Sequence, residues 1–148
     1  MSKPPLPYKT TVTPYLLYED VGAALAFLSQ AFGFRERLRF VEPGGAISHA
    51  ELEVGDALLF LGQPGAGYRN PKHTGHASQF TCVMVPDADA HCRRAREAGA
   101  TIQEEPSDKP WGHRAYDALD LEGHRWSFSH HVRDVASEDW GATRAPAK

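Results

Sequence analysis

The same order of secondary-structure signals occurs twice along this chain, and the repeat constrains the fold more than any other feature. The apolar run VTPYLLY (residues 12–18) precedes the helical pattern VGAALAFLSQAFG, and the run QFTCVMV (residues 79–85) precedes ADAHCRRAREAG. In both helical patterns apolar residues recur every three or four positions, which is typical of an amphipathic helix. The residue chemistry also predicts the helix boundaries: Asp20 and Asp87 as N-caps, and Gly33 and Gly99 as C-terminal stops.

Three strand-like runs follow each predicted helix. They cover residues 34–41, 46–54 and 57–62 in the first half and residues 100–105, 113–119 and 124–131 in the second half. The chain is therefore predicted to contain two copies of a strand-helix-strand-strand-strand module, an α+β fold with mixed sheets. The expected organisation is an N-terminal arm (1–10), module one (11–62), a Gly- and Pro-rich linker (63–78), module two (79–132) and a tail (133–148).

Composition excludes several classes of function. A formal net charge of -3 and a pI near 6.2 give no electrostatic case for nucleic-acid binding. No apolar run approaches the roughly 18 residues of a membrane span, and the arm MSKPPLPYKT lacks the apolar core of a signal peptide. The two cysteines show no CxxC spacing, which is typical of a protein in a reducing compartment. We therefore expect a cytoplasmic protein without membrane or nucleic-acid partners.

The duplicated order resembles the vicinal oxygen chelate superfamily, which includes glyoxalase I, extradiol dioxygenases and bleomycin resistance proteins. The phrases that carry the resemblance are TPYLLYEDVGAALAFLSQAFGF, EPSDKPWGHRAYDALDLEG and GHRWSF, and it extends over about residues 11–132. The resemblance implies two βαβββ modules whose curved mixed sheets enclose a cavity, with helices on the outer faces. It also implies a homodimer.

Enzymes of this superfamily typically hold a divalent metal with His, Gln or Glu side chains from the first and last strands of each module. Carried over by position, these ligands fall on Thr13, Leu59, Phe80 and Ser127. Two of these side chains cannot bind a metal, and the other two offer only neutral hydroxyl oxygens. We therefore predict no metal and no other cofactor at the usual site. His49 and His113 are the alternatives for a displaced site, although both also fit as ordinary polar strand residues.

Strand alternation predicts which side chains face the cavity. In DLEGHRWSFS (residues 120–129), Trp126 and Phe128 should pack beneath the second helix, which turns Arg125, Ser127 and Ser129 inward. For residues 57–62 we expect Leu58 and Phe60 beneath the first helix and Leu59 in the cavity, and we expect Asp117 and Asp120 to be solvated. The complete predicted lining is Thr13, Tyr15, Leu59, Phe80, Cys82, Met84, Trp111, Arg125 and Ser127.

This lining is mainly apolar and aromatic, which is typical of a pocket for planar or apolar organic molecules. Arg125 is expected either to bind a ligand carboxylate or phosphate or to form a salt bridge with Glu122, Asp117 or Glu51. Trp111 could instead belong to a packed turn. Catalytic residues remain unknown.

Three functions follow from this reading. The favoured hypothesis is a metal-free protein of the bleomycin-resistance type that binds or sequesters a small apolar or aromatic molecule. The alternative is a glyoxalase-, isomerase- or dioxygenase-type enzyme with a metal on noncanonical ligands such as His49 and His113. The third is a scaffold subunit without a ligand. The expected partners are thus a small-molecule ligand and a second copy of the chain.

Overall fold

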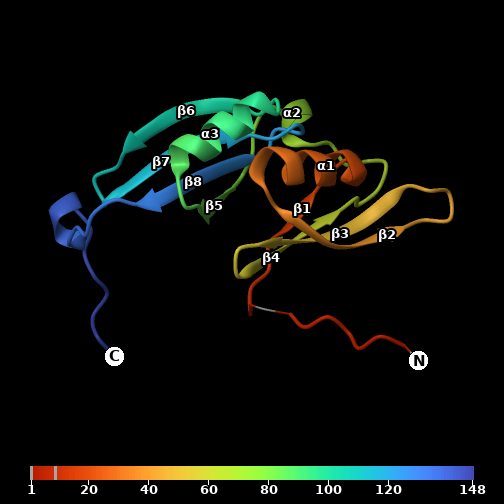
Figure 1. Ribbon diagram of the computed structural model, residues 1–148, viewed down its shortest axis with the longest axis horizontal. Helices are drawn as coiled ribbons and strands as arrows, with labels where there is room; N and C mark the ends of the chain where they lie inside the picture. Colours follow the sequence, from red (N-terminus) through yellow and green to blue (C-terminus); the bar gives the residue numbers. More distant parts are fainter. Residues whose placement is uncertain (1, 9) are drawn as a thin grey trace.

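The computed structural model describes residues 2–8 and 10–148, so positions 1 and 9 of the expected arm lie outside the described residues (Figure 1). The chain forms two four-stranded mixed sheets, each with one parallel pair of strands and two antiparallel pairs. This arrangement confirms the predicted α+β fold class. The strands of the first sheet lie in the order β1 (Tyr15–Leu17), β4 (Ala57–Gly62), β3 (Ile47–Val54) and β2 (Arg35–Val41). The strands of the second sheet lie in the order β5 (Phe80–Met84), β8 (Arg125–His131), β7 (His113–Leu119) and β6 (Thr101–Asp108).

Each sheet is covered on one face by a helix that begins at the predicted aspartate, and the second helix is capped at Ala98, one residue before the predicted Gly99. Helix α1 (Val21–Phe32) begins where the Asp20 carboxylate accepts a hydrogen bond from the Ala23 amide at 2.9 Å. Helix α3 (Ala88–Glu97) begins in the same way, with Asp87 accepting from the Ala90 amide at 3.1 Å. Helix α1 ends at Gly33, whose φ of 75° lies in the left-handed region that glycine adopts without strain.

The two helices contact each other, and each lies against its own sheet (Figure 1). The Arg94 guanidinium on α3 donates to the carbonyls of Ser29 and Gln30 at the end of α1. Beneath them Phe32 packs against Phe128, with ring centroids 4.7 Å apart. The two modules therefore share one hydrophobic core. The faces opposite the helices are called here the open faces of the first and second sheets.

Hydrogen bonds from the turn between β7 and β8 connect the two modules. Its Asp120 accepts a 2.7 Å hydrogen bond from the Tyr18 hydroxyl, and Glu122 accepts from the amides of Glu19 and Asp20. Asp120 and Glu122 are each only 6% exposed. The expectation that Asp120 is solvated is therefore wrong, because four donors from both modules surround this carboxylate.

The linker and the tail each contain one short helical turn. In the linker, α2 (Pro71–Thr74) begins at Asn70, whose side chain accepts from the His73 amide, and ends at Gly75. Asn70 is itself buried and donates to Glu122 at 2.9 Å. In the tail, a 3-10 turn η1 covers Ser137–Trp140. No helix in the described part of the chain has the length and apolar character needed to span a membrane.

The orientation of β4 differs from the prediction by one residue. Leu59 is 2% exposed and belongs to the core beneath α1, whereas Phe60 lies on the open face, where its ring contacts Tyr15. The cause is the turn before the strand. In the first module Val54 pairs with Ala57 across a two-residue turn, whereas in the second module Leu119 pairs with Arg125 across a longer turn. Positions counted from the turn glycines Gly55 and Gly123 are therefore not equivalent in the two modules. A shift of one residue moves every side chain to the other face.

Candidate ligand-binding site

The open face of the second sheet carries an exposed apolar strip beside polar groups. Trp126 and Phe128 are fully buried under α3, which confirms the predicted alternation of β8. Their neighbours Arg125, Ser127 and Ser129 occupy the other face. On the adjoining strand Phe80 is 49% exposed and Met84 is 60% exposed. Large apolar side chains with this exposure are available for contact with a ligand or another chain.

Arg125 is fixed by two neighbours on this face. Its guanidinium donates to the Asp117 carboxylate at 2.5 Å and lies 4.7 Å from the centroid of the Phe80 ring. The salt bridge to Asp117 was one of the two predicted states of Arg125. Asp117 is 7% exposed, so the expectation that it is solvated is wrong. Burial, with a smaller effect from the charge of Asp117, raises the pKa of the Cys82 thiol on the same face, which favours the unreactive thiol form.

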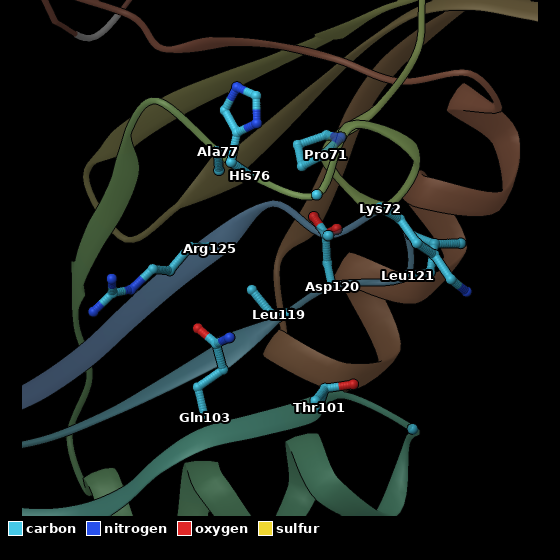
Figure 2. A pocket seen from close by; sticks show the side chains of 13 residues that line it. Pro71, Lys72, His76, Ala77, Thr101, Gln103, Leu119, Asp120, Leu121 and Arg125 are labelled. Carbon is cyan, nitrogen blue, oxygen red and sulfur yellow. The ribbon is translucent and has the colours of Figure 1, made fainter.

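A pocket of about 640 Å³ adjoins Arg125 where the strands of the second sheet meet the linker (Figure 2). One wall comes from Thr101 and Gln103 on β6, with Leu119 from the end of β7. Figure 2 shows His76 and Ala77 of the linker on the opposite side. The volume falls within the range of small-molecule sites. The linker, predicted only as a joint, is thus part of a pocket wall.

The open face of the first sheet holds a chain of polar contacts that the sequence did not reveal. The Tyr15 hydroxyl lies 2.8 Å from His49 Nδ1, and His49 Nε2 lies 3.4 Å from Glu51 Oε1. Glu51 is 6% exposed and forms an ion pair with Arg37, whose Nε lies 3.7 Å from Glu51 Oε2. His49 and Glu51 are two residues apart on β3 and therefore point to the same face. That spacing was the one signal in the sequence that could have predicted this contact.

The ligand positions of the superfamily do not fit a metal in this chain. With the register corrected, Phe60 takes the place of Leu59 among these positions. Phe60 pairs with Tyr15 of β1 in the first module, and Ser127 pairs with Cys82, the equivalent residue of β5, in the second. The four positions are then Thr13, Phe60, Phe80 and Ser127, which offer two hydroxyls and two phenyl rings. In residues 2–8 and 10–148, no three His, Cys, Asp or Glu side chains lie together as a metal-binding group.

The two histidines of the alternative hypothesis lie on different sheets. His49 is on β3 of the first sheet, whereas His113 begins β7 of the second sheet and has its ring against that of His131, with centroids 5.8 Å apart. The described side chains give no geometric support for a metal shared between them.

The structure brings only part of the predicted lining into contact. Phe80 meets Arg125, and Met84 accepts a hydrogen bond from the Ser129 hydroxyl at its sulfur. Tyr15 begins β1 of the first sheet, and Thr13 lies in the irregular segment just before that strand. Trp111 lies in the turn before β7 and packs edge to face against Trp140 of the tail. Convergence of all these side chains around one ligand stays a prediction.

Comparison with known proteins gives a match over most of the chain. The family model described as the Glyoxalase/Bleomycin resistance protein/Dioxygenase superfamily matches residues 11–128. An uncharacterised protein of Mycobacterium bovis is 30% identical over 133 residues, which cover 86% of this chain and 88% of that protein.

Solved structures give the same result for the fold. TioX from Micromonospora sp. ML1 is 37% identical, with a TM-score of 0.69, over 83% of this chain and 99% of TioX. A glyoxalase/bleomycin resistance protein/dioxygenase from Nocardioides is 18% identical, with a TM-score of 0.60, over 100% of this chain and 92% of that one. At this lower identity the similarity concerns the fold alone.

Proposed function

Because the chain belongs to the Glyoxalase/Bleomycin resistance protein/Dioxygenase superfamily, we propose that it binds a small planar or apolar organic molecule without changing it chemically. The ligand contacts the open face of the second sheet and extends toward the pocket beneath the linker. This function is of the bleomycin-resistance type, in which binding alone sequesters the molecule.

The observation that carries the proposal is the pairing of Phe80 with Arg125 beside that pocket. The phenyl ring is half exposed, and the Arg125 guanidinium lies over it, 4.7 Å from its centroid, so an aromatic surface and a group of hydrogen-bond donors lie together. Aromatic rings give large contact area at low entropic cost, and a guanidinium binds anionic groups through its fork of donors. Asp117 holds Arg125 in place without covering it, since the Arg125 side chain remains 44% exposed.

The donor set supports binding rather than metal-assisted chemistry. Two phenyl rings, Phe60 and Phe80, occupy superfamily ligand positions, and neither can bind a metal. We therefore assign no bond-breaking role to any side chain of this face.

The test uses 2-naphthoate, a planar aromatic carboxylate, with naphthalene-2-carboxamide as its neutral counterpart. Calorimetric titration should give saturable binding of both molecules to the wild-type chain. Phe80→Ala should weaken both by about tenfold, the scale of one lost aromatic contact with its buried area. Arg125→Gln should weaken the carboxylate by about tenfold and leave the carboxamide nearly unchanged.

Trp140→Phe is the matched control, because it alters another exposed aromatic ring in the tail. Its affinities should equal those of the wild type. Equal affinities for wild type and Phe80→Ala would contradict the proposed site. A stoichiometric divalent metal in protein purified without chelator would favour the enzymatic alternative instead.

A further inference from the structure

The N-terminal arm lies against the first sheet and contacts a buried arginine there. The Arg37 side chain on β2 is only 6% exposed. Its Nη2 donates to the Pro7 carbonyl at 2.7 Å, and its guanidinium carbon lies 5.7 Å from the centroid of the Tyr8 ring. The Tyr8 ring also meets Phe60 edge to face, with centroids 5.9 Å apart. The arm thus supplies one carbonyl and one aromatic ring to this face.

These contacts leave the guanidinium incompletely satisfied. Glu51 approaches only Nε, at 3.7 Å, which is beyond hydrogen-bonding distance. Arg37 Nη1 is buried and has no hydrogen-bond partner among the described residues. A buried donor of a charged group without an acceptor is costly. A single carbonyl therefore occupies an edge of Arg37 that suits the two oxygens of a carboxylate.

The space around Arg37 is not filled by the arm. A pocket of about 270 Å³ is lined by Leu6 and Pro7 of the arm and by four charged residues, Arg35, Glu36, Arg37 and Glu53. The two carboxylates are already paired, Glu53 with Arg35 and Glu36 with Arg39. Next to it, the rings of Tyr15, His49 and Phe60 contact one another, with centroid separations of 5.6 to 5.8 Å. Tyr8 rests on this aromatic cluster and is itself 68% exposed. Among the described residues, this exposed ring has contacts with Phe60 and Arg37, and such contacts are individually weak.

From these contacts we infer that the first sheet holds a second binding site, for a planar aromatic carboxylate, and that Pro7 and Tyr8 occupy it until such a molecule displaces them. The carboxylate takes the Nη1 and Nη2 edge of Arg37 in place of the Pro7 carbonyl. The aromatic ring replaces Tyr8 against Phe60. This site goes beyond the proposed function because it lies on the other sheet and requires neither Phe80 nor Arg125.

The test is calorimetric titration of the full chain with 2-naphthoate in the Phe80→Ala background, which weakens the second-sheet site. Adding Tyr8→Ala removes the competing ring and should raise the affinity about two- to fivefold, as expected for one exposed cation–π contact. Tyr8→Phe keeps the ring and should leave the affinity unchanged. Arg37→Gln should lower it by about tenfold or more.

Arg93→Gln is the control, because Arg93 is an exposed arginine on α3 and does not line this pocket. It should bind like its parent. The inference is overturned if Tyr8→Ala binds no more tightly than Tyr8→Phe, or if naphthalene-2-carboxamide binds this site as well as 2-naphthoate. Either result leaves the proposed function standing when Phe80→Ala still weakens binding to the wild-type chain. Conversely, a Tyr8 and Arg37 response without any effect of Phe80→Ala supports the first-sheet site alone.

Discussion

The buried carboxylate of Asp120 accepts four hydrogen bonds. Its Oδ2 accepts from the Tyr18 hydroxyl at 2.7 Å and from the Trp126 indole at 3.1 Å. Its Oδ1 accepts from the amides of Glu122 and His124 at 3.0 and 3.1 Å. Burial, and then the charge of Asp120, raises the pKa of Tyr18 well above its ordinary value, so this hydroxyl keeps its proton and remains a donor. The carboxylate is matched to its four partners because it accepts only.

Asp120→Asn should therefore destabilise the protein although it changes the side-chain shape little. The amide NH2 would face either the Trp126 indole or two backbone N–H groups, all of which are donors. We expect the free energy of unfolding to fall by about 2–4 kcal/mol, the scale for a buried charged acceptor that is lost. Urea denaturation measures this change. Asp56→Asn in the exposed hairpin turn is the control, and equal losses in the two variants would contradict the argument.

At the scale of elements, the contact between α1 and α3 depends on a neutral histidine. His91 Nε2 lies 3.0 Å from the Phe32 carbonyl, and its Nδ1 lies 2.5 Å from the Tyr116 hydroxyl. The neutral ring donates at Nε2 and accepts at Nδ1, so both partners are satisfied. Burial, aided by the nearby charge of Arg94, lowers the pKa of His91. Its ring also packs on Phe128, with centroids 4.2 Å apart.

This lowered pKa makes stability depend on pH in a defined direction. The unfolded chain protonates this histidine near pH 6.5, while the folded chain resists protonation until a lower pH. The contribution of His91 is thus complete above about pH 6.5 and is lost as the pH falls below it. In urea denaturation between pH 8 and 5, the stability advantage of wild type over His91→Gln should shrink as the pH falls. Parallel curves would refute this. His76→Gln in the exposed linker should track the wild type.

At the scale of the whole molecule, apolar side chains remain exposed on the strands of both sheets. Phe40, Phe80 and Met84 are each about half exposed or more. In the described part of the chain, β2 and β6 are outermost strands with no further strand paired to their outer edges. Exposed apolar faces and free strand edges are features that proteins usually cover. We expect a second copy of the chain to cover part of this surface, in agreement with the predicted homodimer.

Sedimentation velocity tests this assembly directly. The wild-type chain should sediment as a dimer at micromolar concentration, and Met84→Glu should shift it toward monomer because a charge would be buried without a partner. Leu6→Glu, at a similarly exposed apolar residue of the arm, should leave the dimer intact. A wild-type monomer at every concentration would rule out the prediction.

The sequence alone determined those features that depend on local chemistry. Asp20 and Asp87 begin their helices as predicted, because an N-cap needs only a side-chain oxygen near the first amides. Residues 125–129 were assigned to the correct faces because RWSFS is polar on one side and aromatic on the other. The duplicated order of elements was sufficient for the fold class, since each module needs its helix to cover one face of its own sheet.

Only the tertiary structure decided the rest, because the deciding contacts join residues far apart in sequence. The run ALLFLG of β4 is apolar on both faces, so alternation could not tell which face points inward, and the two-residue turn before it set the register. Asp120 and Glu122 look like solvated turn residues until Tyr18 and the start of α1 fold against them. Arg37 likewise gave no local signal, because its burial depends on an arm thirty residues away along the chain.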